Sequence, residues 1–173
     1  IKHDILFNGN YISNNNEFDQ YLKRFNYTFK NENKETAGYV VLKNKKIILA
    51  MDVGPSPIGP QSNDYQSGAL SFEVISSGKK LISNSGYFPN KQNKLNKLSK
   101  STALQSTLVI EDYSSCSFKK LKSPGYLVDQ GLKIMNKNIV FEGNYWKISA
   151  SHDGYLKKFD SIHNREIEFY PEQ

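Results

Sequence analysis

The stretch YVVLKNKKIILA, residues 39–50, decides the class of fold. Two runs of apolar and β-branched residues, 39–42 and 47–50, flank the four polar residues KNKK. Such runs favour an extended, pleated backbone, and a short polar segment between two of them favours a tight reversal of the chain. The stretch therefore predicts a β-hairpin.

Segments of the same kind recur after this hairpin. Leu70, Phe72 and Val74 alternate onto one face of the next segment. No long amphipathic helix separates the segments, which is typical of antiparallel all-β proteins. The sequence therefore predicts an all-β fold, an antiparallel β-sandwich of two packed sheets. The further strands are expected at residues 70–75, 80–82, 107–111, 125–129, 137–142, 145–151 and 166–169.

Three segments do not follow the strand pattern. The apolar residues of 17–25 have helical spacing and predict one or two helical turns, with an irregular loop as the alternative. Residues 54–60, GPSPIGP, begin a long loop. Residues 91–100 are polar and rich in lysine, and predict a surface loop or one helical turn.

Composition bounds the classes of function. A chain of 173 residues with 38% hydrophobic and 23% charged residues fits one globular domain with its own core. Its formal net charge of +6 comes mainly from lysines. This predicts a solvated lysine surface, with a site for an acidic polymer as the alternative. Nucleic-acid binding is not expected, because the sequence shows no arginine forks or aromatic platforms at set spacings.

Cysteine content and hydropathy add two further expectations. Cys116 is the single cysteine, so no disulfide within the chain is expected. No run of about 18 apolar residues occurs, so membrane insertion is not expected. The chain begins at Ile1 without a signal-peptide pattern, and we expect a longer protein with further sequence upstream.

Four segments, taken in order, resemble motifs of one known family. Residues 68–73, GALSFE, are similar to a His-x-Asp-x-Leu-Ser-Phe-Glu strand, and residues 80–86, KLISNSG, to an apolar strand ending in Asp-x-Gly. Residues 101–108, STALQSTL, are similar to a Ser-Thr-Ala-x-His-Asn-Thr motif. Residues 151–155, SHDGY, followed by HNR at 163–165, are similar to a His-x-Gly-Tyr and His-x-Arg stretch. The chain thus resembles the C-terminal β-sandwich domain of the heparinase II/III-like polysaccharide lyases.

The resemblance covers residues 38–169 and implies an architecture, an activity and partners. Members of the family carry a helical toroid before the sandwich and cut acidic, uronate-containing polysaccharides by β-elimination. Residues 1–37 are then the connector and first edge element, residues 38–173 are the sandwich, and the toroid lies outside this chain. By itself the chain is expected to be inactive, and the protein is expected in the bacterial cell envelope or periplasm.

The positions at which the family carries histidine or aspartate differ in this chain. The resemblance implies that the sandwich brings these groups to the cleft, where some of them hold zinc. They fall on Gln66, Gly68, Asn84 and Gln105. Neutral amides are poor zinc ligands and do not act as bases near neutral pH. We therefore expect no metal site, no cofactor and no retained catalytic residue.

Two interpretations of these substitutions stay open. In the first, Gln66, Asn84 and Gln105 hydrogen-bond a sugar, and the domain binds substrate within a lyase. In the second, the amides satisfy local backbone groups. The domain is then a non-catalytic glycan-binding or structural module that has lost its catalytic and metal-binding residues.

Other polar residues yield further candidates. Within SHDGY, His152 and Tyr155 are candidate substrate-binding residues that face the cleft, with a backbone-bonded turn or rim histidine as the alternative reading of His152. His163 predicts a structural role in the last hairpin. Asp52 lies directly before a Gly-Pro turn and predicts a turn cap.

Overall fold

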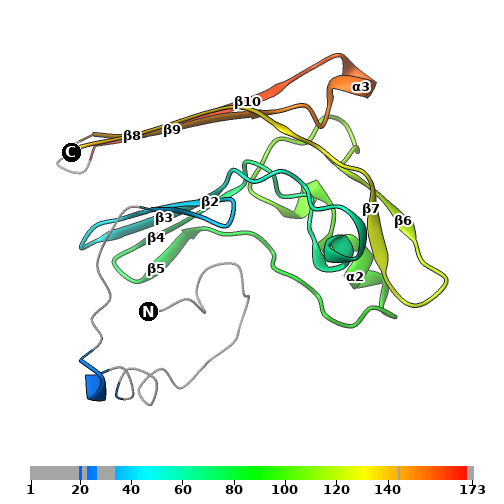
Figure 1. The fold of residues 1–173 in the computed structure, drawn as a ribbon, viewed down its shortest axis with the longest axis horizontal. Helices are drawn as coiled ribbons and strands as arrows, with labels where there is room; N and C mark the ends of the chain where they lie inside the picture. The colour runs from blue at the N-terminus through cyan, green and yellow to red at the C-terminus, as the bar shows by residue number, and fades with distance from the viewer. Residues whose placement is uncertain (1–19, 21–22, 27–33, 144, 171–173) are drawn as a thin grey trace.

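The computed structural model describes residues 20, 23–26, 34–143 and 145–170 of the 173-residue chain. In this part of the chain, two antiparallel sheets lie one above the other (Figure 1). This arrangement confirms the predicted all-β sandwich.

The larger sheet has five strands, which lie side by side in chain order. Its β2–β3 pair is the predicted hairpin, and Asn44 builds the turn. Asn44 Oδ1 accepts the Lys46 and Ile47 N–H groups at 2.9 and 2.7 Å. The strands are β1 (Lys34–Thr36), β2 (Tyr39–Lys43), β3 (Ile47–Asp52), β4 (Phe72–Ser76) and β5 (Lys79–Ile82).

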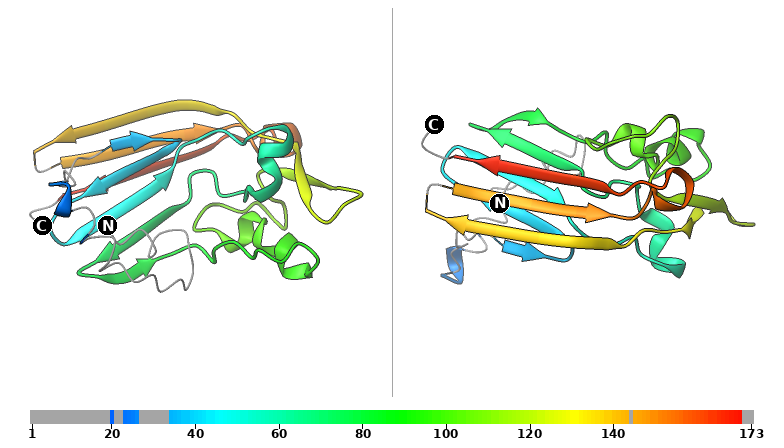
Figure 2. Two further views of the ribbon diagram at one scale, coloured as in Figure 1. Left: turned by 60° about the horizontal axis from the view of Figure 1, so that its bottom comes forward. Right: turned by 90° about the horizontal axis from the view of Figure 1, so that it is seen from above.

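The smaller sheet covers one face of the larger one, as Figure 2 shows. It consists of β8 (Ile134–Glu142), β9 (Tyr145–His152) and β10 (His163–Phe169), with β9 in the middle. A separate hairpin of β6 (Ser117–Lys120) and β7 (Tyr126–Gln130) lies at one end of the sandwich.

Short helices occupy the connections between strands. They include η2 (Gly59–Asp64), α2 (Lys94–Ser99), η3 (Thr102–Leu104) and α3 (Leu156–Phe159). The lysine-rich segment at 91–100 contains α2, and Asn93 caps this helix by accepting the Leu95 N–H at 2.9 Å. In the described ranges, no helix is long and apolar enough to cross a membrane.

The hydrophobic core lies between the two sheets, because alternate residues of a strand point to opposite faces. Phe72 and Val74 pack against this core beside Leu70, so the face predicted for these three residues is confirmed. The buried cluster consists of Val40, Leu42, Leu49, Met51, Val53, Leu70, Trp146, Ile148 and Ala150.

The strand predicted at 107–111 is wrong. This segment holds only an isolated bridge between Ile110 and Tyr113. Glu111 has a φ of +52°, a left-handed conformation that ends an extended run. Leu108 is 43% exposed, so its side chain does not pack into the core.

Some elements lie outside the predicted pattern, and one prediction lies mostly outside the described residues. Strand β6 and helix α3 have four residues each and are mostly exposed, so neither leaves a clear hydrophobic period. The helix predicted at 17–25 falls mostly on residues that the structure does not describe.

Replacing Ile148 by Ala should cost about 2–5 kcal/mol of unfolding free energy, because the deletion leaves a cavity between the sheets. Ile148 is 0% exposed in the middle strand of the smaller sheet. Ile162→Ala is the matched control, since this side chain is 50% exposed, and should cost under about 1 kcal/mol. Denaturant unfolding measures both losses, and equal losses would contradict the position of the core.

Candidate functional site

A small polar pocket lies at the end of the larger sheet, and we call it the amide pocket. Its volume is about 130 Å³. Three predicted binding residues, Gln66, Asn84 and Gln105, meet in it although they come from three separate loops. The full lining is Tyr39, Asp52, Asp64, Tyr65, Gln66, Gly68, Ser71, Asn84, Gly86 and Gln105.

Gln66 ties two of the surrounding loops together. Its Nε2 donates to the carbonyl oxygens of Gly86 and Ser99, both at 2.9 Å. Gln105 Nε2 donates to the same Ser99 oxygen at 3.3 Å. Because both amide protons of Gln66 are used in this way, its carbonyl oxygen is the group left to meet a ligand.

Asn84 is bonded on both sides of its amide. Its Oδ1 accepts the Ser106 N–H at 2.7 Å, and its Nδ2 donates to Ser71 Oγ at 3.3 Å. Gly68 keeps the space beside these groups open. A Cβ at Gly68 would lie 3.2 Å from Ser71 Oγ and 3.6 Å from Gln105 Oε1. At Gly68, where the family carries an aspartate, a side chain would therefore fill the pocket.

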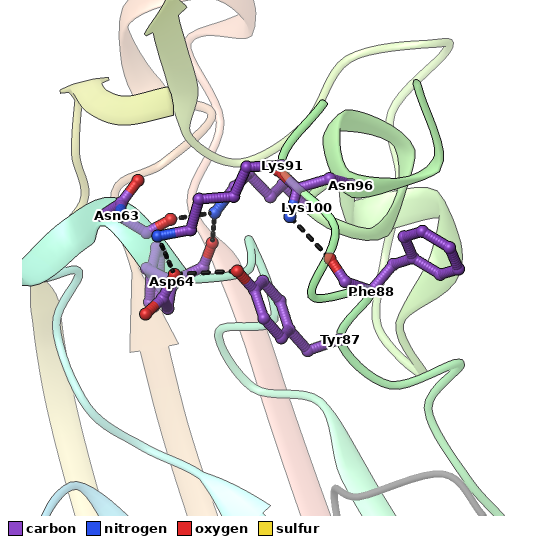
Figure 3. A network of polar contacts seen from close by, with 8 residues as sticks. Asn63, Asp64, Tyr87, Phe88, Lys91, Asn96 and Lys100 are labelled. Carbon is purple, nitrogen blue, oxygen red and sulfur yellow. Dashed lines mark hydrogen bonds and ion pairs between the residues drawn. The ribbon is translucent and has the colours of Figure 1, made fainter. Parts of the chain in front are cut away.

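A buried lysine supports the rim of the amide pocket. Lys100 is 1% exposed, and its Nζ donates to the carbonyl oxygens of Asn63 and Tyr65 at 2.5 and 3.1 Å (Figure 3). Burial lowers the pKa of Lys100 to about 8. These two bonds fix the end of η2 and the residue directly before Gln66.

Asp64 places a negative charge on the same rim. Its Oδ1 accepts the Tyr87 hydroxyl at 2.8 Å and lies 3.2 Å from Lys91 Nζ (Figure 3). The bond from Tyr87 and the charge of Lys91 hold the pKa of Asp64 below its usual value. The Asp64 carboxylate is therefore ionised at neutral pH.

A second carboxyl lies deeper in the pocket. Asp52 ends β3 opposite Tyr39 of β2. Its Oδ1 accepts the Gly54 N–H at 3.0 Å, so the predicted turn cap is confirmed. Burial nevertheless raises the pKa of Asp52 to about 7, so this carboxyl exchanges its proton near neutral pH. Burial, together with the carboxyls of Asp52 and Glu73, raises the pKa of Tyr39 to about 12.

The sequence motifs do not assign a site role to Asp52, Tyr39 or Glu73. The alternation of side chains along the strands does point to these residues. In β3, Ala50 and Asp52 lie out of phase with the core residues, and Glu73 of β4 pairs with Ala50. Asp52 and Glu73 are only 8% and 2% exposed. Buried acids on the non-core face of a sheet point to a site rather than to a solvated surface.

The other two predicted binding residues lie apart from the amide pocket. His152 and Tyr155 are each 1% exposed. The Tyr155 hydroxyl donates to the Leu108 carbonyl oxygen at 2.7 Å, and His152 Nδ1 accepts the Gly154 N–H at 3.0 Å. Both side chains thus bond internally, and their role in binding substrate stays a prediction.

His152 also forms a ring-to-ring hydrogen bond with His163. The atoms His152 Nε2 and His163 Nδ1 are 3.1 Å apart. Because His152 Nδ1 accepts a backbone N–H, the ring proton of His152 lies on Nε2 and is donated to His163. Burial lowers the pKa of both histidines to about 4. This contact agrees with the structural role predicted for His163.

The residues of the amide pocket do not fit the zinc ion that the resemblance implies. The amide nitrogens of Gln66 and Gln105 bond to backbone carbonyls, and that of Asn84 bonds to Ser71. Zinc prefers imidazole, thiolate and carboxylate ligands. Among the residues that the structure describes, no three His, Cys, Asp or Glu side chains are grouped to hold a metal ion.

Comparisons with known proteins agree with this fold. The family model described as "Heparinase II/III-like, C-terminal" matches residues 32–173. The crystal structure of heparinase III has 16% identity and a TM-score of 0.58, over 92% of this chain and 26% of that one. A mutant heparan sulfate lyase from Pedobacter heparinus has 14% identity and a TM-score of 0.64, over 95% and 27%. No curated protein matches. The chain thus spans about a quarter of each similar structure, and the likeness shows the fold alone.

Replacing Asp52 by Asn should stabilise the protein at pH 8. The carboxyl has a pKa of about 7 when folded and an ordinary value of 3.8. The native state therefore loses stability as the pH rises between these values, because the unfolded chain gives up this proton first. Asparagine retains an acceptor for Gly54 without the charge. We expect a gain of about 2–4 kcal/mol at pH 8 that shrinks towards pH 4, measured by denaturant unfolding.

Asp64→Asn is the matched control for this prediction. The pKa of Asp64 is lowered rather than raised, so its ionised form contributes stability above its unfolded pKa. The control should lose a little stability at pH 8. A gain in both variants would show that the loss of any carboxylate, and not the burial of Asp52, is responsible.

The histidine pair should contribute a loss of stability as the pH falls below about 6.5, opposite in sign to the contribution of Asp52 over the same range. Both folded pKa values lie below the ordinary value of 6.5. The unfolded chain therefore binds protons that the native state excludes. The loss between pH 6.5 and pH 5 should reach up to about 2 kcal/mol per histidine. In His163→Gln this pH-dependent loss should be smaller, whatever the stability of the variant at pH 7. Thermal unfolding at pH 7 and pH 5 measures this loss in both proteins. An equal loss in wild type and in His163→Gln would contradict a pair of neutral histidines.

Proposed function

We propose that this chain, which belongs to the heparinase II/III-like C-terminal domain family, forms the β-sandwich side of the substrate cleft in a polysaccharide lyase. The proposed substrate is an acidic, uronate-containing polysaccharide, and the proposed reaction is β-elimination. The observation that carries the proposal is the meeting of Gln66, Asn84 and Gln105 with Asp52 in one pocket.

β-Elimination at a uronate has three chemical requirements. The sugar carboxylate must be neutralised so that the proton on C5 becomes acidic. A base must then remove this proton, and an acid must protonate the departing O4 oxygen. Amide groups supply only hydrogen bonds, so the amide pocket serves binding and orientation of the substrate rather than proton transfer.

Asp52 adds a group that changes protonation in the working pH range. A carboxyl with a pKa of about 7 is partly protonated at neutral pH, and in that form it donates a hydrogen bond. A protonated Asp52 and the Gln105 amide, which line the same pocket, offer donors without a full positive charge. Such donors suit a sugar oxygen or carboxylate that must be bound reversibly.

The proposed function also implies a domain arrangement, a partner domain and a location in the cell. Residues 1–37 are the connector and first edge element, and residues 38–173 are the sandwich. An N-terminal helical toroid of the same protein supplies the proton-transfer groups, and the protein acts in the bacterial cell envelope or periplasm. The net charge of +6 supports attraction of an anionic polymer.

A non-catalytic module is the second candidate, and one observation favours it. Gln66 and Asn84 use their amide nitrogens to hold loops of the domain together. Polar groups that serve the protein itself need no substrate to account for them. The sandwich would then bind glycan without cutting it, or pack as a structural partner of the toroid.

Binding of the 173-residue chain to uronate-rich polysaccharides, at low and at moderate salt, tests whether the amide pocket recognises substrate. Gln105→Ala should weaken binding about 5–20-fold, because it removes polar contacts from the pocket wall. Gln92→Ala is the matched control, since Gln92 is exposed and outside the pocket, and should bind as wild type does.

The outcomes separate the candidate functions. Binding that persists at moderate salt and drops only in Gln105→Ala supports the proposal. Binding that salt abolishes equally in all three proteins would reduce the site to a charged surface. The protein that includes the toroid then distinguishes lyase from module, because β-elimination releases a sugar with a conjugated, ultraviolet-absorbing double bond. Binding without this product would identify a glycan-binding module.

A further inference from the structure

A second cavity, larger than the amide pocket, opens at one end of the sandwich, and we call it the lysine pocket. Its volume is about 660 Å³, within the range of pockets that hold a small ligand. The turn from β9 into α3 and the end of β7 both contribute to it, and these elements lie at the end opposite the β2–β3 turn (Figure 1). The lining that matters is Tyr113, Gln130, Asp153, Lys157, Lys158 and Phe159.

Two lysines give this pocket positive charge. The ion pairs found among the described residues involve Lys91, Lys137 and Lys147, and neither Lys157 nor Lys158 has a carboxylate partner there. The Lys158 ammonium lies over the ring of Tyr113 and 5.6 Å from the ring centre of Phe159. Aromatic rings position an ammonium and remove water from one side of it without neutralising it. The pocket therefore presents a positioned cation.

Groups that suit sugar hydroxyls occur in the same lining. Asp153 Oδ1 accepts the Lys133 N–H at 2.7 Å, which fixes the orientation of the carboxylate. Ser117 Oγ accepts the Gln130 N–H at 3.0 Å, and both residues line the pocket. A carboxylate, an amide and a hydroxyl together satisfy hydroxyl groups that each donate and accept.

The hydrogen bonds behind the lysine pocket connect it to the amide pocket. Thr102 Oγ1 donates to the carbonyl oxygen of Ser67, which follows Gln66, at 2.8 Å. The same Thr102 oxygen lies 3.2 Å from Ser115 Oγ in the lysine-pocket lining. The two linings therefore share one buried framework, which gives the lysine pocket a defined shape.

We propose that the lysine pocket binds one carboxylated sugar residue. The sugar carboxylate lies at Lys157 and Lys158, beside the ring of Tyr113, and the hydroxyls face Asp153 and Gln130. The choice of a sugar rests on the proposed function, whereas its anionic character follows from the two lysines. A neutral sugar would leave the ammonium groups unused, and a polyphosphate, with several negative charges, would be repelled by Asp153 more strongly than a single carboxylate.

Titration of the 173-residue chain with a uronate disaccharide, followed by calorimetry and by NMR signals of the Tyr113 and Phe159 rings, tests this assignment. Lys158→Met keeps the aliphatic contact with the rings and removes the charge. It should weaken binding at least about 5-fold, the loss typical of a charge-assisted hydrogen bond. Lys45→Met is the matched control, because Lys45 is exposed in the β2–β3 turn, and should leave binding unchanged. The disaccharide with its carboxyl group reduced to an alcohol should bind wild type as weakly as the acid binds Lys158→Met.

Two results would overturn the inference: equal affinity of wild type and Lys158→Met, or equal affinity of the acidic and the reduced sugar. The variants distinguish a failure of the lysine-pocket proposal from a failure of the amide-pocket proposal. If Gln105→Ala weakens binding and Lys158→Met does not, the proposed function stands and the lysine pocket is not the site. If only Lys158→Met weakens binding and the Tyr113 signals shift, the lysine pocket binds the sugar and the amide pocket does not.

Discussion

The alternation of side chains along β3 is the constraint on which the rest of the structure depends. Leu49 and Met51 point between the sheets, while Ala50 and Asp52 point to the opposite face. Pairing on both sides fixes this register, with Tyr39 opposite Asp52 and Ala50 opposite Glu73. A slip by one residue would turn Asp52 into the core and a core residue into the pocket. The hydrophobic pattern that forms the sandwich thus also directs the acids to the amide pocket.

The loops around the pocket depend on side chains rather than on sheet pairing. Gln66 connects the segment before β4 to the loop after β5 and to the end of α2. Arg165 of the smaller sheet donates to the carbonyl oxygens of Leu70 and Ser106, at 2.9 and 2.6 Å, and so connects both sheets to the loop that carries Gln105. Each of these bonds satisfies a backbone carbonyl that no strand would satisfy, which allows irregular chain to be held close to the sheet.

The sequence predicts the fold well where apolar residues form short runs, as in the β2–β3 hairpin, or alternate over several positions, as in β9. It fails at 107–111, where Thr107 Oγ1 bonds to the Ala69 carbonyl oxygen and a left-handed Glu111 follows. Apolar composition alone does not reveal such side-chain and backbone constraints. The meeting of Gln66 and Gln105 follows from the family motifs, because no local pattern brings separate loops together. The role of Asp52 beyond its turn depends on burial, which a single residue in a sequence does not show.

The electrostatics of the amide pocket support the proposal that it binds a ligand. Asp52 and Lys100 are both buried, and neither forms an ion pair among the described residues, although the charge of Asp64 acts on Lys100. Burial moves their pKa values towards neutrality from opposite sides, to about 7 and about 8. An unpaired buried ionisable group costs stability, and an apolar residue of similar size would remove this cost. Of the two groups, Asp52 lines the pocket of 130 Å³, whereas Lys100 donates to two backbone carbonyls at its rim. The buried carboxyl of Asp52 is therefore the group that a ligand in this pocket would meet.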